Sequence, residues 1–100
     1  MSRHVLEPDV LIDSDSTSYV SAPVDMSKYS WIVLNTRGTD GRTLGTTLID
    51  SNTFVDCGTI SHQAAFGKEP TSYCAIAYYS GGRVYAKSSS TFDRVTVMAI

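Results

Sequence analysis

Charge is scarce in this sequence of 100 residues. Lys, Arg, Asp and Glu together make up 18% of it, whereas a soluble domain typically contains roughly 25%. The net charge is −2, and the eight basic residues are scattered singly along the chain. Because nucleic acids are bound mainly by clustered cations that contact the phosphates, the sequence argues against a nucleic-acid partner.

Long apolar runs are missing as well. No stretch approaches the roughly 18 apolar residues that indicate a membrane-spanning helix. The first residues, Met1-Ser2-Arg3-His4, are followed by Glu7 and Asp9 instead of the apolar core of a secretory signal. We therefore expect neither insertion into a membrane nor a secretory signal.

Cysteine and histidine are too few and too dispersed for a metal centre. A zinc site usually takes four ligands, and its cysteines are typically two to four residues apart, but Cys57 and Cys74 are far more widely spaced. We expect no metal and no cofactor. Cys57 and Cys74 either pair across neighbouring strands or, as we favour, remain buried free thiols that behave as small apolar side chains.

Catalytic patterns are equally absent. The sequence contains no G-x-S-x-G nucleophile motif. Asp50 and Asp56 are candidates, by proximity in sequence alone, for the carboxylate pair that a glycoside hydrolase uses, and turn-forming aspartates are the better interpretation. We therefore expect a protein that is not an enzyme.

What the sequence does contain is typical of β-structure. It has 25 serine and threonine residues, nine valines and ten aromatic residues. From 72 to 100, apolar and polar residues alternate with a period of two, which predicts strands over 73–79, 83–87 and 94–99. Gly81-Gly82 supplies the two positive-φ positions of a tight hairpin turn. Val97 is expected on the core face of the last of these strands.

Similar segments upstream predict five more strands. They cover 5–12 (interrupted by Pro8), 18–20, 30–37, 42–50 and 52–60. Trp31 to Leu34 is apolar throughout, which predicts a central strand covered on both faces. Asp25 is expected to cap one helical turn, and Gly45 to form a bulge or a point of close backbone approach. Gly38 to Gly41 predicts a hairpin loop, and 62–70 a surface loop or short helix.

Together these segments predict an all-β fold, an antiparallel β-sandwich of jelly-roll-like form with about seven or eight strands. Residues 22–100 would form the sandwich domain, and residues 1–21 an N-terminal arm or an edge strand.

Tyrosines gather on the predicted C-terminal hairpin. Tyr78 and Tyr79 are adjacent, so at most one of them can lie on the core face. The tyrosines form either ordinary cross-strand pairs or one face that binds a partner. The surface residues that we consider candidates for contacting a partner lie near the two hairpins: Asn35, Arg37 and Asp40 at the first, and Tyr79, Arg83 and Tyr85 at the second.

The arrangement of these segments resembles the β-rich module at the C-terminal ends of tail-fibre and other virion proteins of tailed bacteriophages. Val24-Asp25-Met26-Ser27-Lys28-Tyr29 and the apolar strand after it match the opening of the module, and Thr46 to Ile49 with Phe54 match its middle. Tyr73 to Tyr79, Ser80-Gly81-Gly82 and Val95 to Ile100 match its close.

The resemblance implies a bacteriophage virion structural protein without enzymatic activity: a small fibre, spike or capsid decoration protein. It implies a homo-oligomer, usually a homotrimer, that contacts other virion proteins, is made in the host cytoplasm, and takes part in host attachment, for example to a surface glycan. The alternative from the residues themselves is a monomeric carbohydrate-binding (lectin-like) module. In that case a sugar site would be formed by residues near the two hairpins: Asn35, Arg37 and Asp40 at the first, with Tyr79 and Arg83 at the second.

Overall fold

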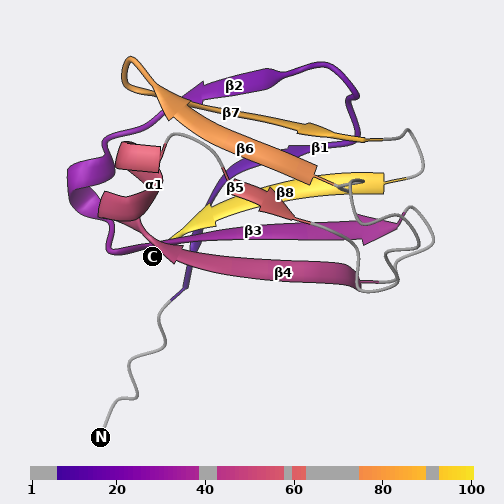
Figure 1. The fold of residues 1–100 in the computed structure, drawn as a ribbon, viewed down its shortest axis with the longest axis horizontal. Helices are drawn as coiled ribbons and strands as arrows, with labels where there is room; N and C mark the ends of the chain where they lie inside the picture. The colour runs from indigo at the N-terminus through magenta and orange to yellow at the C-terminus, as the bar shows by residue number, and fades with distance from the viewer. Residues whose placement is uncertain (1–6, 39–42, 58–59, 63–74, 90–92) are drawn as a thin grey trace, which may run out of the picture.

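The chain folds into two antiparallel β-sheets packed face to face, which confirms the predicted all-β sandwich (Figure 1). The structure, a computed structural model, describes residues 7–38, 43–57, 60–62, 75–89 and 93–100. The first sheet has the order β1-β8-β3-β4, and the second has the order β2-β7-β6-β5. The strands of the first sheet are β1 (Asp9–Ser14), β8 (Asp93–Ala99), β3 (Trp31–Gly38) and β4 (Thr43–Asp50). Those of the second are β2 (Val20–Pro23), β7 (Arg83–Ser88), β6 (Ala75–Ser80) and β5 (Ile60–His62).

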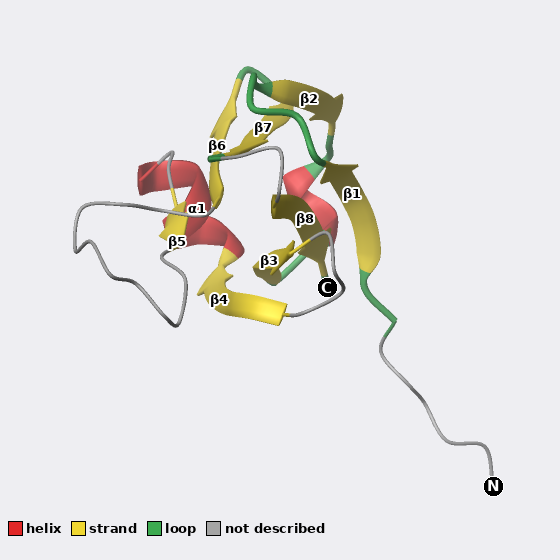
Figure 2. Cartoon of the chain, turned by 90° about the vertical axis from the view of Figure 1, so that its right-hand side faces the viewer, coloured by secondary structure: helices red, strands yellow, loops and turns green. Residues whose placement is uncertain are grey.

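In both sheets, a strand from the beginning of the chain pairs with a strand from its last third. The first strand, β1, pairs with the last strand, β8, and the second strand, β2, pairs with β7. This wrapping of early strands beside late ones gives the sandwich its jelly-roll-like form. Seen along the strands, the two sheets lie one above the other, with the helix α1 (Ser51–Cys57) at one side (Figure 2).

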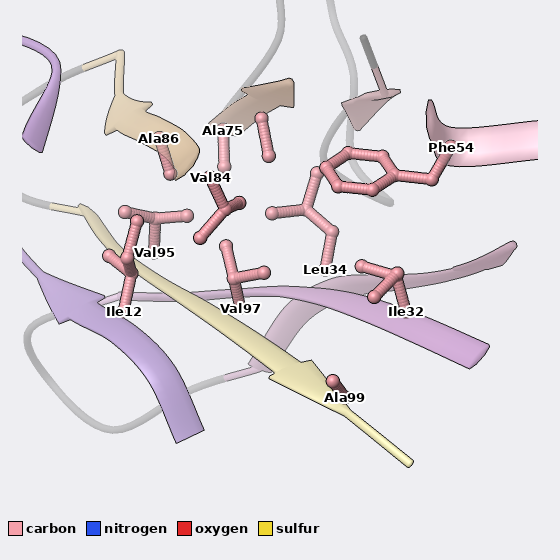
Figure 3. Packing of buried hydrophobic residues seen from close by; sticks show 11 residues of the cluster. Ile12, Ile32, Leu34, Phe54, Ala75, Val84, Ala86, Val95, Val97 and Ala99 are labelled. Atoms are coloured by element: carbon pink, nitrogen blue, oxygen red, sulfur yellow. The ribbon is translucent and has the colours of Figure 1, made fainter. Parts of the chain in front are cut away.

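The core lies between the sheets and follows the predicted alternation. Every second residue of β8 (Val95, Val97 and Ala99) is buried, and Val84 and Ala86 of β7 face them from the other sheet (Figure 3). The remaining members of the cluster come from β1, β3, α1 and β6: Ile12, Ile32, Leu34, Phe54, Ala75 and Ala77. Burial of this apolar surface is the main force that holds the two sheets together.

The predicted glycine turn is confirmed. Gly81 and Gly82 connect β6 and β7 with φ angles of 57° and 79°, the left-handed values that a two-residue hairpin turn requires and that side chains disfavour. The turn fixes the register in which Tyr78 lies opposite Tyr85.

The prediction of a strand over 52–60 is wrong, because most of this segment forms the helix α1. The carboxylate of Asp50 accepts hydrogen bonds from the backbone N–H of Thr53 (2.8 Å) and from the Thr53 hydroxyl (2.7 Å), which is N-terminal capping of a helix. Phe54 then points into the core. The capping interaction and one large apolar anchor outweigh the β-propensity of Val55, and among the described residues of the segment Ile60 alone lies in a strand.

The cap makes the helix sensitive to pH. The backbone N–H and the hydroxyl of Thr53 lower the pKa of Asp50 below its ordinary value of 3.8. A carboxyl group with a lowered pKa stabilises the fold at pH values above its unfolded-state pKa, and this contribution is lost as the pH falls through the folded-state pKa.

We expect Asp50→Ala to lower the thermal midpoint at pH 7, and the difference from wild type to shrink below pH 3.8. Asp50→Asn, which keeps an acceptor oxygen, should lose less. A difference independent of pH would contradict the assigned cap.

The prediction that Trp31 to Leu34 is covered on both faces is also wrong. Strand β3 is central in its sheet, but only Ile32 and Leu34 are buried, whereas 45% of Trp31 is exposed. Nothing among the described residues packs over the outer side of this sheet, so an apolar run here marks an apolar surface.

The division predicted at residue 21 falls inside β2, so the sandwich does not begin at residue 22. Residues 9–14 form an edge strand, as one of the two alternatives had it, and this strand starts directly after Pro8. A separate arm over 1–21 is incompatible with the pairing of β1 and β2 with β8 and β7.

Two smaller predictions agree with the structure, and others lie outside the described residues. Asp25 caps the short 3₁₀ helix η1 (Met26–Lys28), and its carboxylate accepts a hydrogen bond from the Ser27 backbone N–H. The register of β3 and β4 shifts beside Gly45, as expected of a bulge. Asp40, Cys74 and residues 63–70 are not described, so the loops predicted there and the pairing of Cys57 with Cys74 stay predictions.

Candidate functional site

Aromatic side chains collect on the outer face of the second sheet. Tyr78 and Tyr85 are cross-strand partners on β6 and β7, and Tyr19 lies just before β2, next to Lys87. The inward-facing residues of these strands, such as Ala77, Val84 and Ala86, are buried. Alternation therefore turns the tyrosines outward. We call Tyr19, Tyr78, Tyr85, Lys87 and Arg83 the tyrosine face.

The rings of the tyrosine face form one continuous cluster, in which one pair is stacked and the other meets edge-on. Those of Tyr78 and Tyr85 are nearly parallel, with centroids 4.7 Å apart and an interplanar angle of 9°. Tyr19 meets Tyr78 edge-on, with centroids 5.1 Å apart. The ammonium group of Lys87 lies 4.8 Å from the centre of the Tyr19 ring, within the range of a cation–π interaction. These contacts hold the rings in fixed orientations.

Arginine borders the cluster at the hairpin end. Arg83 donates hydrogen bonds from Nε and Nη2 to the hydroxyl of Ser21, at 3.2 and 3.1 Å. The guanidinium group is thereby directed along the sheet toward β2. The tyrosine face thus presents flat amphipathic rings between two cations, a combination suited to contact with a sugar ring or with a protein surface.

The five predicted contact residues that the structure describes do not converge on one site. Arg83 and Tyr85 belong to the tyrosine face, but Tyr79 lies on the inner side of β6, with its ring centroid 6.4 Å from that of Phe54. Tyr79 is therefore a partly buried residue that packs against the core. Asn35 and Arg37 lie on the outer face of the first sheet, on the opposite side of the sandwich. Asp40 is outside the described residues.

The outer face of the first sheet carries a polar row whose side chains bond to one another. Asn35 donates a hydrogen bond to the Thr46 hydroxyl (2.7 Å). Asp13 accepts hydrogen bonds from Arg94 and Thr96. The bond from Arg94, the largest influence, lowers the pKa of Asp13, and the same bond raises that of Arg94. Since both side chains of this ion pair are solvated, the pair contributes little to stability.

Beside this polar row lies an apolar one that sequence reasoning missed. Val10, Met98, Val33 and Leu48 are register partners across all four strands of the first sheet. Val10 and Leu48 are 59% and 58% exposed. One row further along, Trp31 and Ile100 exchange backbone hydrogen bonds of 3.1 and 2.9 Å. We call these residues the apolar band: Val10, Trp31, Val33, Leu48, Met98 and Ile100.

Single exposed apolar residues are ordinary on a protein surface, but a contiguous group is not. The band runs across the sheet from edge to edge, and it is the kind of surface that another protein covers. The sequence did contain a signal for the apolar band, namely the apolar run over 31–34. Whether such a run is buried or exposed depends on whether another layer covers the outer face of its strand.

Tyr19 was also missed. Its neighbourhood, 18–23, is too short and too polar to reveal which way the side chain points, and its partners Tyr78 and Lys87 are distant in sequence.

Within the described ranges, no three His, Cys, Asp or Glu side chains are placed to hold a metal ion. In the same part of the chain, no helix has the length and apolar character needed to cross a membrane. Comparison of the chain with protein-family models, curated proteins and solved structures finds no significant match.

Proposed function

We propose that this chain is a non-enzymatic structural protein of a bacteriophage particle surface, a small fibre, spike or decoration protein that assembles as a homotrimer. The observation that carries the assembly part of the proposal is the apolar band, which extends over all four strands of the first sheet. The bacteriophage part rests on the resemblance of 25–100 to the tail-fibre module. Under this proposal the protein resides in the virion.

The tyrosine face is assigned the adhesive role. Its stacked rings and two cations would contact a host-surface glycan or a neighbouring virion protein, while the apolar band on the opposite side binds copies of the chain itself. The two functions then use different sheets and do not compete for one surface.

The proposal is tested by light scattering on a size-exclusion column at two protein concentrations. We expect a mass of about 33 kDa, three times the 10.9 kDa of one chain, that persists on dilution, because apolar contacts between copies dominate such an interface. A mass near 11 kDa at both concentrations would contradict the proposed assembly.

A monomeric carbohydrate-binding module is the second candidate, favoured by the 43% exposure of Tyr19 beside Lys87. It is distinguished by a glycan array probed with labelled wild-type protein and with Tyr19→Ala. A monomer whose glycan signal is lost in Tyr19→Ala would favour this candidate over the particle protein.

A further inference from the structure

We propose that the tyrosine face binds an acidic oligosaccharide, a glycan whose sugar rings carry carboxylate groups, and that Arg83 and Lys87 hold these carboxylates. The inference rests on the proposed adhesive role of this face. It goes further, since it names the class of ligand and the residues that select it. A neutral glycan and an acidic protein surface are the alternatives that the test separates.

The strands of the second sheet carry positive charge, although the whole chain has a net charge of −2. They read VSAP, ISH, AIAYYS and RVYAKS, so they contain Arg83 and Lys87 but no aspartate or glutamate. The strands of the first sheet, in contrast, contain four aspartates together with two arginines. The sheet that carries the rings is therefore the one whose charge is complementary to an anionic ligand.

The partners of the two cations within the described residues are uncharged. The ammonium group of Lys87 lies over the Tyr19 ring, and Arg83 donates hydrogen bonds from Nε and Nη2 to the Ser21 hydroxyl. A guanidinium group has five N–H donors in one plane, so three remain after these two bonds, on Nη1 and Nη2. They form the outer end of the fork, and a carboxylate can accept two parallel hydrogen bonds there.

The spacing of the cations calls for a ligand longer than one sugar. Arg83 and Lys87 lie on the same side of β7, four residues apart, which corresponds to about 13 Å along a strand. Tyr85 lies between them, with the Tyr78 ring stacked against its own. A ligand that reaches both cations therefore has carboxylates repeated along a chain, with sugar rings that can contact the tyrosines between them.

The size of the face and its hydroxyl groups favour a glycan over a protein. Strands β6 and β7 have six residues each, so with β2 they cover a flat area of at most about 280 Å², whereas each partner in a stable protein interface buries about 800 Å². The hydroxyl groups of Tyr19, Tyr78 and Tyr85 form no hydrogen bond with another described residue. Each can donate to and accept from the hydroxyl groups of a sugar.

The first test compares charged and neutral forms of the same sugars. Isothermal titration calorimetry is carried out on the full chain with oligomers of alginate, polygalacturonate and hyaluronate, each beside its methyl ester. We expect at least one of the uronates to bind, and its ester to bind at least about tenfold more weakly, because the ester cannot accept charge-assisted hydrogen bonds. Polyglutamate, the probe for an acidic protein, should bind more weakly than that uronate.

The second test places the binding on the tyrosine face. Arg83→Gln should weaken uronate binding at least about tenfold, since it removes the fork together with its charge. The matched control is Lys28→Gln, which removes one positive charge from an exposed residue of η1 outside the face. Its affinity should equal that of the wild type. Far-UV circular dichroism verifies that both variants are folded.

The outcomes separate this inference from the proposed function. Methyl esters that bind as tightly as the uronates would overturn the acidic class of ligand and leave the adhesive role in place. Polyglutamate bound as tightly as the uronates would overturn the glycan. Equal losses in the two variants, or a wild type that binds none of the uronates, would overturn the assigned site. The mass measured by light scattering tests the proposed assembly independently of all of these.

Discussion

Replacement of Val97 by aspartate is expected to leave no soluble folded protein. Val97 is fully buried in the middle of β8, which lies between β1 and β3, and its side chain meets those of the second sheet (Figure 3). A carboxylate there would have neither water nor a cation as partner. The cost of burying it is several kcal/mol or more, comparable with the total stability of about 5–15 kcal/mol of a small domain. The soluble fraction and the far-UV circular dichroism spectrum measure the outcome.

Val97→Ala is the matched control for this position. It removes two methyl-sized groups without introducing charge, and it should cost about 2 kcal/mol of unfolding free energy while the protein stays folded. If Val97→Asp were soluble and as stable as the alanine variant, the assignment of Val97 to the core face of β8 would be wrong.

Removal of the Phe54 ring should be the most damaging change that still leaves a measurable fold. Phe54 is the largest fully buried side chain and joins α1 to the core, where its ring contacts that of Tyr79. We expect Phe54→Ala to lower the unfolding free energy by about 3–5 kcal/mol. In a domain of this size, a loss of 3 kcal/mol lowers the thermal midpoint by at least about 12 °C. Urea unfolding curves provide the free energies.

The control for Phe54 is its neighbour Val55, which belongs to the same helix and is 38% exposed. Val55→Ala improves intrinsic helix propensity and removes only two methyl-sized groups from a partly exposed side chain, so its effect should stay within about 0.5 kcal/mol. Equal losses in the two variants would mean that α1 contributes through its backbone and not through the Phe54 anchor.

The predictable part of the fold is the part with local signals. The alternation over 72–100 and the pair Gly81-Gly82 define three strands, their faces and one turn, and the structure agrees where it describes them. The helix α1 was not predicted because its cap and its anchor, Asp50 and Phe54, sit in a segment whose valine and threonine residues favour a strand. Tertiary contacts decided between helix and strand for this segment.

The assignment of strands to sheets could not be predicted, because it depends on pairing between distant segments. Asp9 pairs with Ala99, at the other end of the chain, and Val20 pairs with Ala86. No local pattern encodes such pairs. The exposure of Trp31 follows from this arrangement, since an apolar run is buried on both faces only if another layer covers the sheet.

For the candidate surfaces, the sequence predicted which way a side chain points from its strand, but not which strands lie side by side. Alternation correctly separated Tyr78 from Tyr79 and turned Arg83 and Tyr85 outward. It could not show that Tyr19 joins the ring cluster, or that Asn35 and Arg37 lie on the opposite side of the sandwich from Tyr85. Both facts arise from which strands lie side by side and from the packing of one sheet on the other.

The central claim is that three copies of this chain assemble into one particle, and small-angle X-ray scattering coupled to size-exclusion chromatography tests it most directly. Three chains packed into one compact particle of 300 residues would have a radius of gyration of about 19 Å, with a mass of about 33 kDa. This result is the one we predict. A radius near the 13.5 Å of the single chain, together with a mass near 10.9 kDa, would contradict it.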